Sequence, residues 1–575
     1  MREIKTDILI LGSGGAGLFA ALHAHNAAPD LDVTVAVKGL LGKCGCTRMV
    51  QGGYNVALAP GDSVERHFMD TIEGGKWLPD QDLAWTLVST AIERIHELEN
   101  ELGCFFDRNP DGSVHQKAFA GQTFDRTVHK GDLTGIEIIN RLSEKVWDCG
   151  VNRLEEHRAV ELIKSEDGQS LSGVVMIDIR SGEFVFVQAR AVLLATGGGP
   201  TMYRYHTPSG DKSCDGMAMA LRAGLDLRDM EMVQFHPTGL LAGTETRMTG
   251  TVLEEGLRGA GGYLLNGAKE RFLLNYHERG ERATRDIVSR GIFEEIRSGR
   301  GTPHGGVYIS MSHLGPESVK EQFKGMVERC ADCGFDLAGG LVEVVPTAHY
   351  MMGGVLFNPD CSTGLFGLFA AGEDTGGVHG ANRLGGNGVA NSTVFGGIAG
   401  DSMAKWLGEG VDYRAPDRAV IEEVEQRCRY PLDKPTGDLF AVQNALRDLM
   451  WEDVGIMRQR DRLEGVAARL DDLEAQLDAI GIGGGDNLAY NVTWHEWLNL
   501  KNQLLVSRAI TVSALAREDS RGAHYREDFP DSGAPTDSNY ICVRLDNGDL
   551  AVRQVPVQFT RVKPGESLIV ESAEG

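Results

Sequence analysis

A strand that runs straight into a glycine-rich turn opens the chain and limits what it can fold into. Residues 4–11 are apolar enough for a strand buried on both faces, and residues 18–25 have the pattern of a helix. The turn between them contains four glycines, Gly12, Gly14, Gly15 and Gly17. Glycines at this spacing permit a tight turn, close approach of a pyrophosphate and close packing of helix on sheet. The segment therefore predicts a Rossmann-like dinucleotide-binding unit.

The residue after the next predicted strand is unusual for such a unit. Residues 33–37 form that strand, and Lys38 follows it directly. An acidic residue normally stands there to hold the ribose hydroxyls of NAD. Its absence argues against NAD as the ligand.

Two further strands end in glycine-rich turns far along the chain. Residues 191–195 lead into Thr196 and Gly197, and residues 367–371 lead into Gly372 and Glu373. Three such junctions predict one large cofactor-binding sheet. The segment from about 234 to 349 is then best explained as a cap inserted between the later strands, with a cleft between cap and sheet.

The remaining patterns complete the predicted organisation. The fold class is α/β, with a split Rossmann-like cofactor-binding domain, an inserted α+β capping domain and a C-terminal helical domain. Heptad-like runs at 463–477 and 494–515 predict bundle core, a glycine-rich loop follows at 481–485, and the tail alternates as strands do. The predicted boundaries are 1–233 and 353–412 for the split domain, 234–352 for the cap, 413–530 for the helical domain, and 531–575 for an extension with short strands.

Composition and charge exclude several classes of partner. The 575-residue chain has 57 Lys and Arg against 82 Asp and Glu, and its net charge of −25 repels nucleic acid and acidic lipid. An anionic substrate therefore needs a locally cationic pocket. No run approaches the roughly 18 consecutive apolar residues of a membrane-spanning helix, so we expect membrane association only through partner subunits.

The cysteines favour a reducing compartment and predict no metal site. Ten cysteines are scattered through the chain, which favours free thiols and a cytoplasmic location. Partner subunits could hold the chain at the inner face of a membrane. Cys330 and Cys333 have the spacing of a redox or zinc half-site, but no second pair lies at zinc-ribbon distance. Clustered iron–sulfur ligands are also missing, so electrons need a route outside this chain.

Six segments, in a fixed order along nearly the whole chain, resemble one known family. They are Gln51-Gly-Gly, Phe235-His-Pro-Thr-Gly, Arg285-Asp, His349-Tyr-Met-Met-Gly-Gly, His379-Gly-Ala-Asn-Arg-Leu-Gly and Ser520-Arg-Gly-Ala-His-Tyr-Arg-Glu-Asp. The chain resembles the flavoprotein subunit of the succinate dehydrogenase and fumarate reductase family, which also includes L-aspartate oxidase. The resemblance implies FAD as the cofactor and a split fold like the one predicted above.

The resemblance also implies which positions contact FAD. Glu373 is the expected carboxylate at a helix end. Asp215 is either an FAD contact or the cap of a helix that begins near Gly216, and both interpretations stay open. The implied FAD-binding residues are Gly12, Gly14, Gly15, Gly17, Lys38, Thr47, Gln51, Gly52, Gly53, Thr196, Gly197, Asp215, Glu373 and Asn387.

For the substrate, the resemblance implies a C4 dicarboxylate held at both ends. Arg383 is implied to anchor a carboxylate, which a guanidinium binds bidentately while keeping its charge. His236 and His349 are implied to hold the carboxylates, and Glu254 lies beside them in the sequence pattern. Clamping both ends lets binding energy polarise the central bond for hydride exchange with the flavin.

The resemblance assigns proton transfer to three charged residues. Arg285 is implied to exchange the proton at the second central carbon, fed by Glu255 and Arg258. Arginine can do this only where neighbouring cations destabilise its charge or a chain passes the proton on. The alternative for Glu255 and Arg258, at i and i+3, is an ion pair that only stabilises a helix.

Two positions depart from the family pattern. Cys46 stands where respiratory members carry the histidine that links FAD covalently, so we expect an inert thiol beside noncovalent FAD rather than a thioether, and fumarate reduction or an oxidase activity. Glu254 replaces a threonine, and its charge would repel a substrate carboxylate unless it is protonated or turned away. Residues 241–251 also lengthen this segment, where Thr249 or Thr251 could supply the missing hydroxyl.

These features predict an FAD-dependent flavoprotein that interconverts fumarate and succinate and exchanges electrons with a separate iron–sulfur subunit. The alternative is a soluble L-aspartate oxidase, which needs no such partner. A third hypothesis is a flavin-binding subunit without catalysis, which the retained charged residues disfavour. Co-purification with a cysteine-rich protein, aspartate-dependent peroxide production, and bound FAD without turnover distinguish the three.

Overall fold

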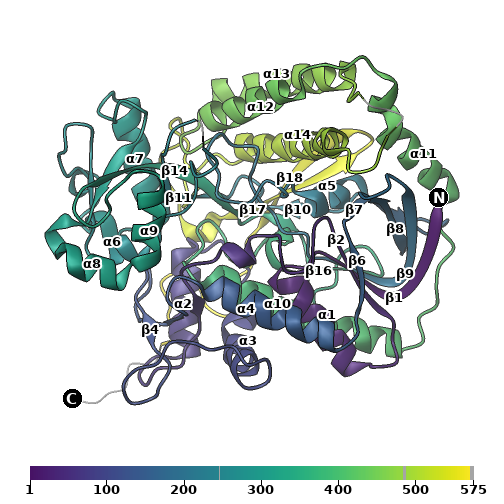
Figure 1. Ribbon diagram of the computed structural model, residues 1–575, viewed down its shortest axis with the longest axis horizontal. Coiled ribbons are helices and arrows are strands. Elements are labelled where there is room, and N and C mark those ends of the chain that lie inside the picture. Colours follow the sequence, from purple (N-terminus) through teal and green to yellow (C-terminus); the bar gives the residue numbers. More distant parts are fainter. Residues whose placement is uncertain (245, 484–486, 570–575) are drawn as a thin grey trace.

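The computed structural model describes residues 1–244, 246–483 and 487–569. A seven-stranded sheet of order β6-β2-β1-β9-β8-β7, in which β16 also pairs with β9, forms its centre (Figure 1). The strands β6, β2, β1, β9 and β16 pair in parallel, whereas β7 and β8 pair antiparallel. The strands are β1 (Arg2–Leu11), β2 (Val33–Val37), β6 (Asn152–Glu155), β7 (His157–Lys164), β8 (Leu171–Asp178), β9 (Phe184–Leu194) and β16 (Leu368–Ala370).

Three of these strands end at the same level of the sheet. The register places Leu11 opposite Leu194, and Leu194 opposite Ala370. The glycine-rich turns after β1, β9 and β16 therefore lie side by side, as the sequence predicts. They form the carboxyl edge, where open α/β sheets bind their ligands.

On one side of the sheet, the long helix α10 packs against α1, the helix that begins at the opening turn. The helices α1 and α10 pack backbone to backbone, since a Cβ atom at Gly396 would lie 2.5 Å from the carbonyl oxygen of Ala16. A small sheet of order β3-β5-β4 lies in the same part of the chain. These elements are α1 (Gly15–Ala27), α2 (Val64–Gly74), α3 (Gln81–Asn100), α4 (Thr134–Asp148), α10 (Asn387–Gly408), β3 (Tyr54–Asn55), β4 (Gln116–Lys117) and β5 (Thr127–Val128).

The cap is an antiparallel sheet with helices, inserted before β16. Its strand order is β11-β14-β13-β12, and β11 and β14 lead the chain into and out of the cap (Figure 1). The elements are β11 (Val233–Leu240), α6 (Gly256–Gly259), β12 (Tyr263–Leu265), α7 (Arg285–Arg297), β13 (Val307–Ser310), α8 (Pro316–Gln322), α9 (Lys324–Asp332) and β14 (Leu341–Met351). This insertion confirms the predicted fold class, while the domain boundaries stay a prediction.

The C-terminal third is helical and closes with a hairpin. Long helices lie above the sheet in Figure 1, and the hairpin joins two short earlier strands in a sheet of order β15-β10-β17-β18. Part of the predicted loop at 481–485 lies outside the described residues. The helices of this third are α11 (Arg418–Arg429), α12 (Leu439–Asp453), α13 (Arg460–Ala479) and α14 (Val492–Ala516), and the hairpin strands are β17 (Asn539–Asp546) and β18 (Asp549–Pro556). The earlier strands of the sheet are β10 (Leu227–Arg228), which α5 (Asp215–Arg222) precedes, and β15 (Gly354–Val355).

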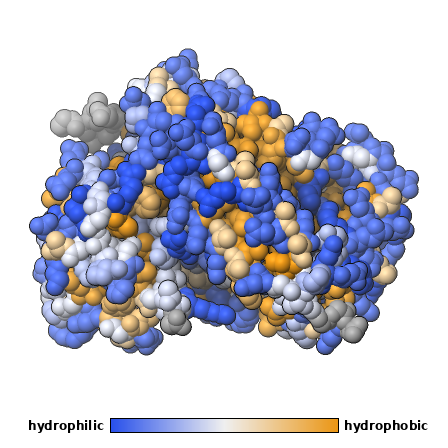
Figure 2. Space-filling model, turned by 90° about the horizontal axis from the view of Figure 1, so that it is seen from above, coloured by the Kyte–Doolittle hydropathy of each residue, from blue (hydrophilic) through white to orange (hydrophobic). Residues whose placement is uncertain are grey.

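A groove lies beside the helical domain. Figure 2 shows this face of the molecule, with hydrophobic residues gathered in its middle. A cavity of about 620 Å³ is lined there by Leu470 and Trp497 from the helices and by Leu550 from the hairpin. The cations that rim it are held by carboxylates, as when Arg508 and Lys501 both contact Glu474.

The opening turn tolerates a side chain at one glycine and not at another. A Cβ atom at Gly17 would lie 2.0 Å from the carbonyl oxygen of Gly12, whereas one at Gly14 would meet only the Thr47 hydroxyl at 3.5 Å. We expect Gly17→Ala to destabilise the fold by about 1–3 kcal/mol or more through overpacking, and Gly14→Ala to change stability little. Thermal unfolding of both variants without added ligand tests this, and equal effects would contradict it.

A histidine joins three helices on the packed side of the sheet. His23 on α1 contacts Glu97 on α3 and Asp401 on α10, each at 3.0 Å. Burial would lower the pKa of His23, but these two carboxylates outweigh it and raise the pKa to about 9. The contribution of His23 to the free energy of unfolding is therefore fully present below about pH 6.5 and is lost as the pH rises through 9.

We expect the stability difference between the wild type and His23→Leu to shrink by on the order of 2 kcal/mol between pH 6 and pH 10, after allowing for the half-exposed Asp401. Urea unfolding at the two pH values measures it. His25→Leu, on the same helix, is the control that should show no such change. A difference for His23→Leu that does not depend on pH would refute the assignment.

Candidate functional site

A cavity of about 510 Å³ lies where the carboxyl edge of the sheet meets the cap. The structure brings most of the predicted site residues to its walls. From the cofactor-binding domain these are Gly14, Gly15, Thr47, Gln51, Gly52, Gly53, Thr196, Gly197, Glu373 and Arg383, and from the cap they are His236, Glu254, Glu255, Arg285 and His349. Cofactor and substrate positions predicted from distant segments thus share one cavity.

The opening turn presents backbone donors to this cavity. Helix α1 begins after Gly14, which is extended and makes no side-chain cap. Gly12 has a φ of +115°, and a Cβ atom there would lie 2.1 Å from the carbonyl oxygen of Ala195. Only glycine fits so close to the neighbouring strand. The N–H of Gly15 donates to the Thr47 hydroxyl at 3.0 Å, and the positive end of the helix dipole suits a pyrophosphate, so the cradle fits a dinucleotide such as FAD.

Two predicted cofactor residues lie outside the cavity walls. Gly17 packs α1 against the turn. Asn387 is buried behind the cavity, where its side-chain oxygen accepts a hydrogen bond from Asn55 at 2.8 Å and its amide donates to the Thr71 hydroxyl at 3.2 Å. Their visible contacts are therefore with the protein.

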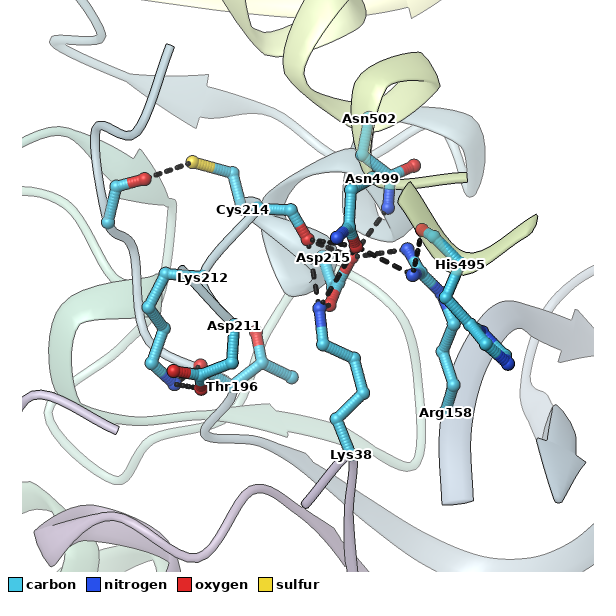
Figure 3. Close-up of polar contacts among 12 residues, drawn as sticks. Lys38, Arg158, Thr196, Asp211, Lys212, Cys214, Asp215, His495, Asn499 and Asn502 are labelled. Atoms are coloured by element: carbon cyan, nitrogen blue, oxygen red, sulfur yellow. Dashed lines mark hydrogen bonds and ion pairs between the residues drawn. The ribbon is translucent and has the colours of Figure 1, made fainter. Parts of the chain in front are cut away.

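A smaller adjoining cavity of about 50 Å³ is lined by Gly12, Lys38 and Asp215. Figure 3 shows how the Asp215 carboxylate is held: Lys38 contacts it at 2.8 Å and Arg158 at 3.1 Å. Burial would raise the pKa of Asp215, but these two cations hold it well below its usual range. Burial lowers the pKa of Lys38. The carboxylate is thus charged and fixed at the edge of the cofactor cradle.

The alternative role of Asp215 as a helix cap does not match this geometry. Asp215 is the first residue of α5, Cys214 is the N-cap, and no side chain caps the helix. Asn502 on α14 instead donates to Asp215 at 2.7 Å, and Asn499 accepts from Arg158 (Figure 3). Sequence patterns predicted only bundle core for α14, so these partners were missed.

Two adjacent carboxylates follow β16, the half-buried Glu373 and the buried Asp374. Glu373 accepts hydrogen bonds from the backbone N–H groups of Met351 at 3.0 Å and Gly199 at 3.3 Å, and burial raises its pKa. Asp374, which sequence reasoning missed, accepts from the N–H of Gly197 at 3.1 Å and from Thr196. Burial raises the pKa of Asp374 to about 7. These contacts tie the turns after β9 and β16 together.

The three residues predicted for proton transfer form a continuous buried chain. Arg285 contacts one oxygen of the Glu255 carboxylate at 2.6 Å, and Arg258 contacts the other at 3.1 Å. Burial would raise the pKa of Glu255, but the two arginines lower it, while burial lowers the pKa of Arg258. Arg258 and Glu255 are at most 4% exposed, so they are no surface ion pair.

Two neutral histidines lie beside this chain. The rings of His236 and His349 are 5.3 Å apart, and Nδ1 of His349 lies 2.8 Å from the Thr207 hydroxyl. Burial, followed by the charge of Arg285, lowers the pKa of both well below the usual range. Each ring is therefore a neutral polar group that can contact a carboxylate without an ion pair.

Arg383 is available to a ligand. Its guanidinium lies 4.3 Å from the centre of the Tyr350 ring, and it makes no ion pair with a carboxylate in the described part of the chain. Its Nε atom is buried without a partner there. Burial and the charge of Arg285 lower its pKa to about 10, which still leaves it charged near neutral pH. Such a cation fits a substrate carboxylate.

Glu254, whose charge is expected to repel a substrate carboxylate unless it is protonated or turned away, has a partner that sequence reasoning missed. Lys117 on β4 forms a very short ion pair with the Glu254 carboxylate. Burial raises the pKa of Glu254, and Lys117 opposes this. The pair is neutral as a unit, so it does not repel an anion. Of the candidate hydroxyls, only that of Thr251 belongs to a residue that lines the described cavity, and both donate to backbone carbonyl oxygens: Thr251 to Met248 at 2.7 Å and Thr249 to Gly243 at 2.6 Å.

Cys46 lines the same cavity as a protonated thiol. Burial, reinforced by the charge of Glu373, raises its pKa to about 12. A thiol of this kind is a poor nucleophile, since the thiolate is the reactive form.

The described residues contain no membrane-crossing candidate and no grouped metal ligands. None of their helices is both long and apolar enough to span a bilayer. Nowhere among residues 1–244, 246–483 and 487–569 do three His, Cys, Asp or Glu side chains come together as possible ligands of a metal ion.

A dinucleotide cradle that opens onto a capped cluster of arginines and histidines defines an FAD-dependent oxidoreductase. Comparison with known proteins agrees: a family model described as FAD binding domain matches residues 7–389, and one described as fumarate reductase flavoprotein C-term matches residues 443–568. The chain belongs to the flavoprotein-subunit family of succinate dehydrogenases and fumarate reductases, as its sequence motifs predict.

Individual relatives match along nearly their whole length. One fumarate reductase (CoM/CoB) subunit of Methanothermobacter marburgensis is 43% identical over 92% of this chain and 95% of its own. The 8-methylmenaquinol:fumarate reductase flavoprotein subunit of Wolinella succinogenes is 36% identical over 97% of this chain and 91% of its own. A solved structure of the quinol fumarate reductase flavoprotein FrdA of Escherichia coli superposes with a TM-score of 0.93 at 32% identity, covering 98% of this chain and 99% of that one.

Proposed function

We propose that this chain is the FAD-containing subunit of a fumarate reductase that interconverts fumarate and succinate. The observation that carries the proposal is the buried Arg285–Glu255–Arg258 chain beside an arginine with no carboxylate partner in the described residues, Arg383, in the cavity that meets the dinucleotide cradle. The names of the relatives with the same fold, which are fumarate reductase subunits, support it.

The residues of the site fit roles at the two ends of a dicarboxylate and at its central bond. Arg383 binds one carboxylate, and His236 and His349 contact the substrate as neutral groups. Arg285 passes a proton to one central carbon, and Glu255 with Arg258 restores it, because the shared carboxylate links the two guanidiniums. Bound FAD supplies or accepts the hydride at the other carbon. Burial of the cluster under the cap excludes water.

FAD is held noncovalently in this proposal. The glycine turn and the N-terminus of α1 would hold its pyrophosphate, and the Lys38–Asp215 pair lines the adjoining part of the same cradle. The missing acidic residue at position 38 fits FAD rather than NAD. Loss of a covalent link favours fumarate reduction as the working direction.

Electrons reach the flavin from another protein, which we propose to be an iron–sulfur subunit. The sequence provides no clustered cysteine ligands for an iron–sulfur centre. The relatives named above are subunits. A cytoplasmic chain that reaches the inner face of a membrane only through such partners accords with the net charge of −25.

Fumarate should reoxidise the reduced flavin of the wild type and fail to do so when Arg285 is replaced. We expect Arg285→Ala to slow the return of the oxidised-flavin absorbance about 10²–10⁴-fold, because the proton donor is lost. The purified protein is reduced with dithionite under anaerobic conditions, and fumarate is then added. Arg282→Ala, an exposed arginine of the same cap, is the control and should behave as wild type.

Absence of reoxidation in the wild type would overturn the proposed substrate. The same flavin assay would then be run in the oxidative direction with aspartate, which tests the L-aspartate oxidase alternative. Equal rates in the wild type and Arg285→Ala would instead remove Arg285 from the proton path.

Denaturation with acid should release all the flavin. Because the half-buried Cys46 thiol is protonated, we expect no covalent adduct, and the precipitated chain should keep the mass of its sequence. Cys46→Ser should bind the same amount of FAD as the wild type. A flavin that stays with the wild-type precipitate but not with that of Cys46→Ser would show a thioether instead.

A further inference from the structure

Arg329 places a second available guanidinium on the wall of the substrate cavity. It lies on α9 of the cap, is half-buried, and lines the same cavity as Arg383. Its Nη1 atom donates a hydrogen bond to the carbonyl oxygen of Val252 at 3.1 Å. The amide of Gln51, oriented with its oxygen toward Arg329, accepts from both guanidinium nitrogens. The side chain is thus held in place by neutral groups.

The other cations around Arg329 are already neutralised. Lys117 pairs with Glu254, and Arg285 pairs with Glu255. Arg329 makes no ion pair with any carboxylate of the described residues, although it lies on the same wall as these pairs. Its charge is therefore available to an anion that enters the cavity.

One further arginine of the lining, Arg48, lacks a carboxylate partner among the described residues, but it lies at the cofactor end of the cavity. It follows Thr47, whose hydroxyl accepts a hydrogen bond from the N–H of Gly15 in the opening turn at 3.0 Å. Arg48 donates to the carbonyl oxygen of Gly42 and to the side-chain oxygen of Asn140, each at 3.5 Å. Arg329 contacts the carbonyl oxygen of Val252, two residues before Glu254. Arg383 and Arg329 therefore remain as the two guanidiniums without a carboxylate partner in the described lining that lie next to predicted substrate residues, one from the cofactor-binding domain and one from the cap.

We infer that Arg329 is a specificity-determining residue that binds the second carboxylate of the substrate, while Arg383 binds the first. The inference rests on the proposed function. A dicarboxylate carries two charges, and each needs a donor when it leaves water. Glu254 and Lys117 satisfy each other, so neither offers this wall a free donor. Arg329 supplies the missing donor, and the Gln51 amide orients the Arg329 guanidinium.

Fumarate and its monoamide, fumaramate, test this assignment, because they share one carbon frame and differ by one negative charge. Each is titrated into the oxidised FAD-loaded protein, and the dissociation constant is taken from the change in flavin absorbance, so no turnover is involved. We expect Arg329→Met to weaken fumarate binding about 10- to 100-fold, as for loss of a charge-assisted hydrogen bond, and fumaramate binding much less. The preference for fumarate over fumaramate should therefore fall.

Two further variants separate this role from a structural one. Arg329→Lys keeps the charge and should retain part of the preference. Arg282→Met removes an exposed arginine that, like Arg329, donates to a backbone carbonyl of the cap, and should leave both constants unchanged. FAD content and thermal unfolding of each variant report whether the fold is intact.

An unchanged ratio of the two constants in Arg329→Met would overturn the inference, whether both ligands bind as in the wild type or both weaken equally. That outcome leaves the proposed function standing as long as fumarate reoxidises the reduced wild-type flavin. If the wild type neither binds fumarate nor is reoxidised by it, the proposed function itself fails. The two failures are therefore distinguishable.

Discussion

The common end point of three parallel strands is the constraint on which the rest of the structure depends. Because Leu11, Leu194 and Ala370 stand level in the sheet, three glycine-rich turns from distant parts of the chain meet at one edge. Helix α1 begins there, and the carboxylates after β16 bind the backbone of the turn after β9. The chain enters and leaves the cap beside this edge, so the charged residues of the cap line the same cavity.

Buried charge in the site is balanced in small units. Glu255 forms ion pairs with two arginines, Glu254 forms one with a lysine, and the two histidines are neutral. Burying an isolated charge is costly, so each unit is sustained by its partner. What stays unbalanced is the positive charge that an anionic substrate would neutralise. The overall net charge of −25 gives no hint of this local excess.

Local patterns were sufficient for the strands, the glycine turns and the cap, because each leaves a signal within a short window. The gathering of His236, His349, Arg285 and Arg383 came from motifs. Partners set by long-range packing could not be predicted: Lys117 lies 137 positions from Glu254, and Asn502 lies 287 positions from Asp215. For Glu254 the sequence left open whether its charge would repel a substrate carboxylate, because no sequence window contains both Glu254 and its partner Lys117.

The contact between α14 and Asp215 has a consequence for the helical domain. This helix lines neither the cradle nor the substrate cavity, yet Asn502 donates to the Asp215 carboxylate that holds Lys38, and Asn499 accepts a hydrogen bond from Lys38 itself at 3.2 Å (Figure 3). A ligand that binds only the folded cradle stabilises every element whose folding the cradle requires. FAD bound in the cradle would therefore stabilise α14 as well, although this helix contributes no residue to the cradle wall.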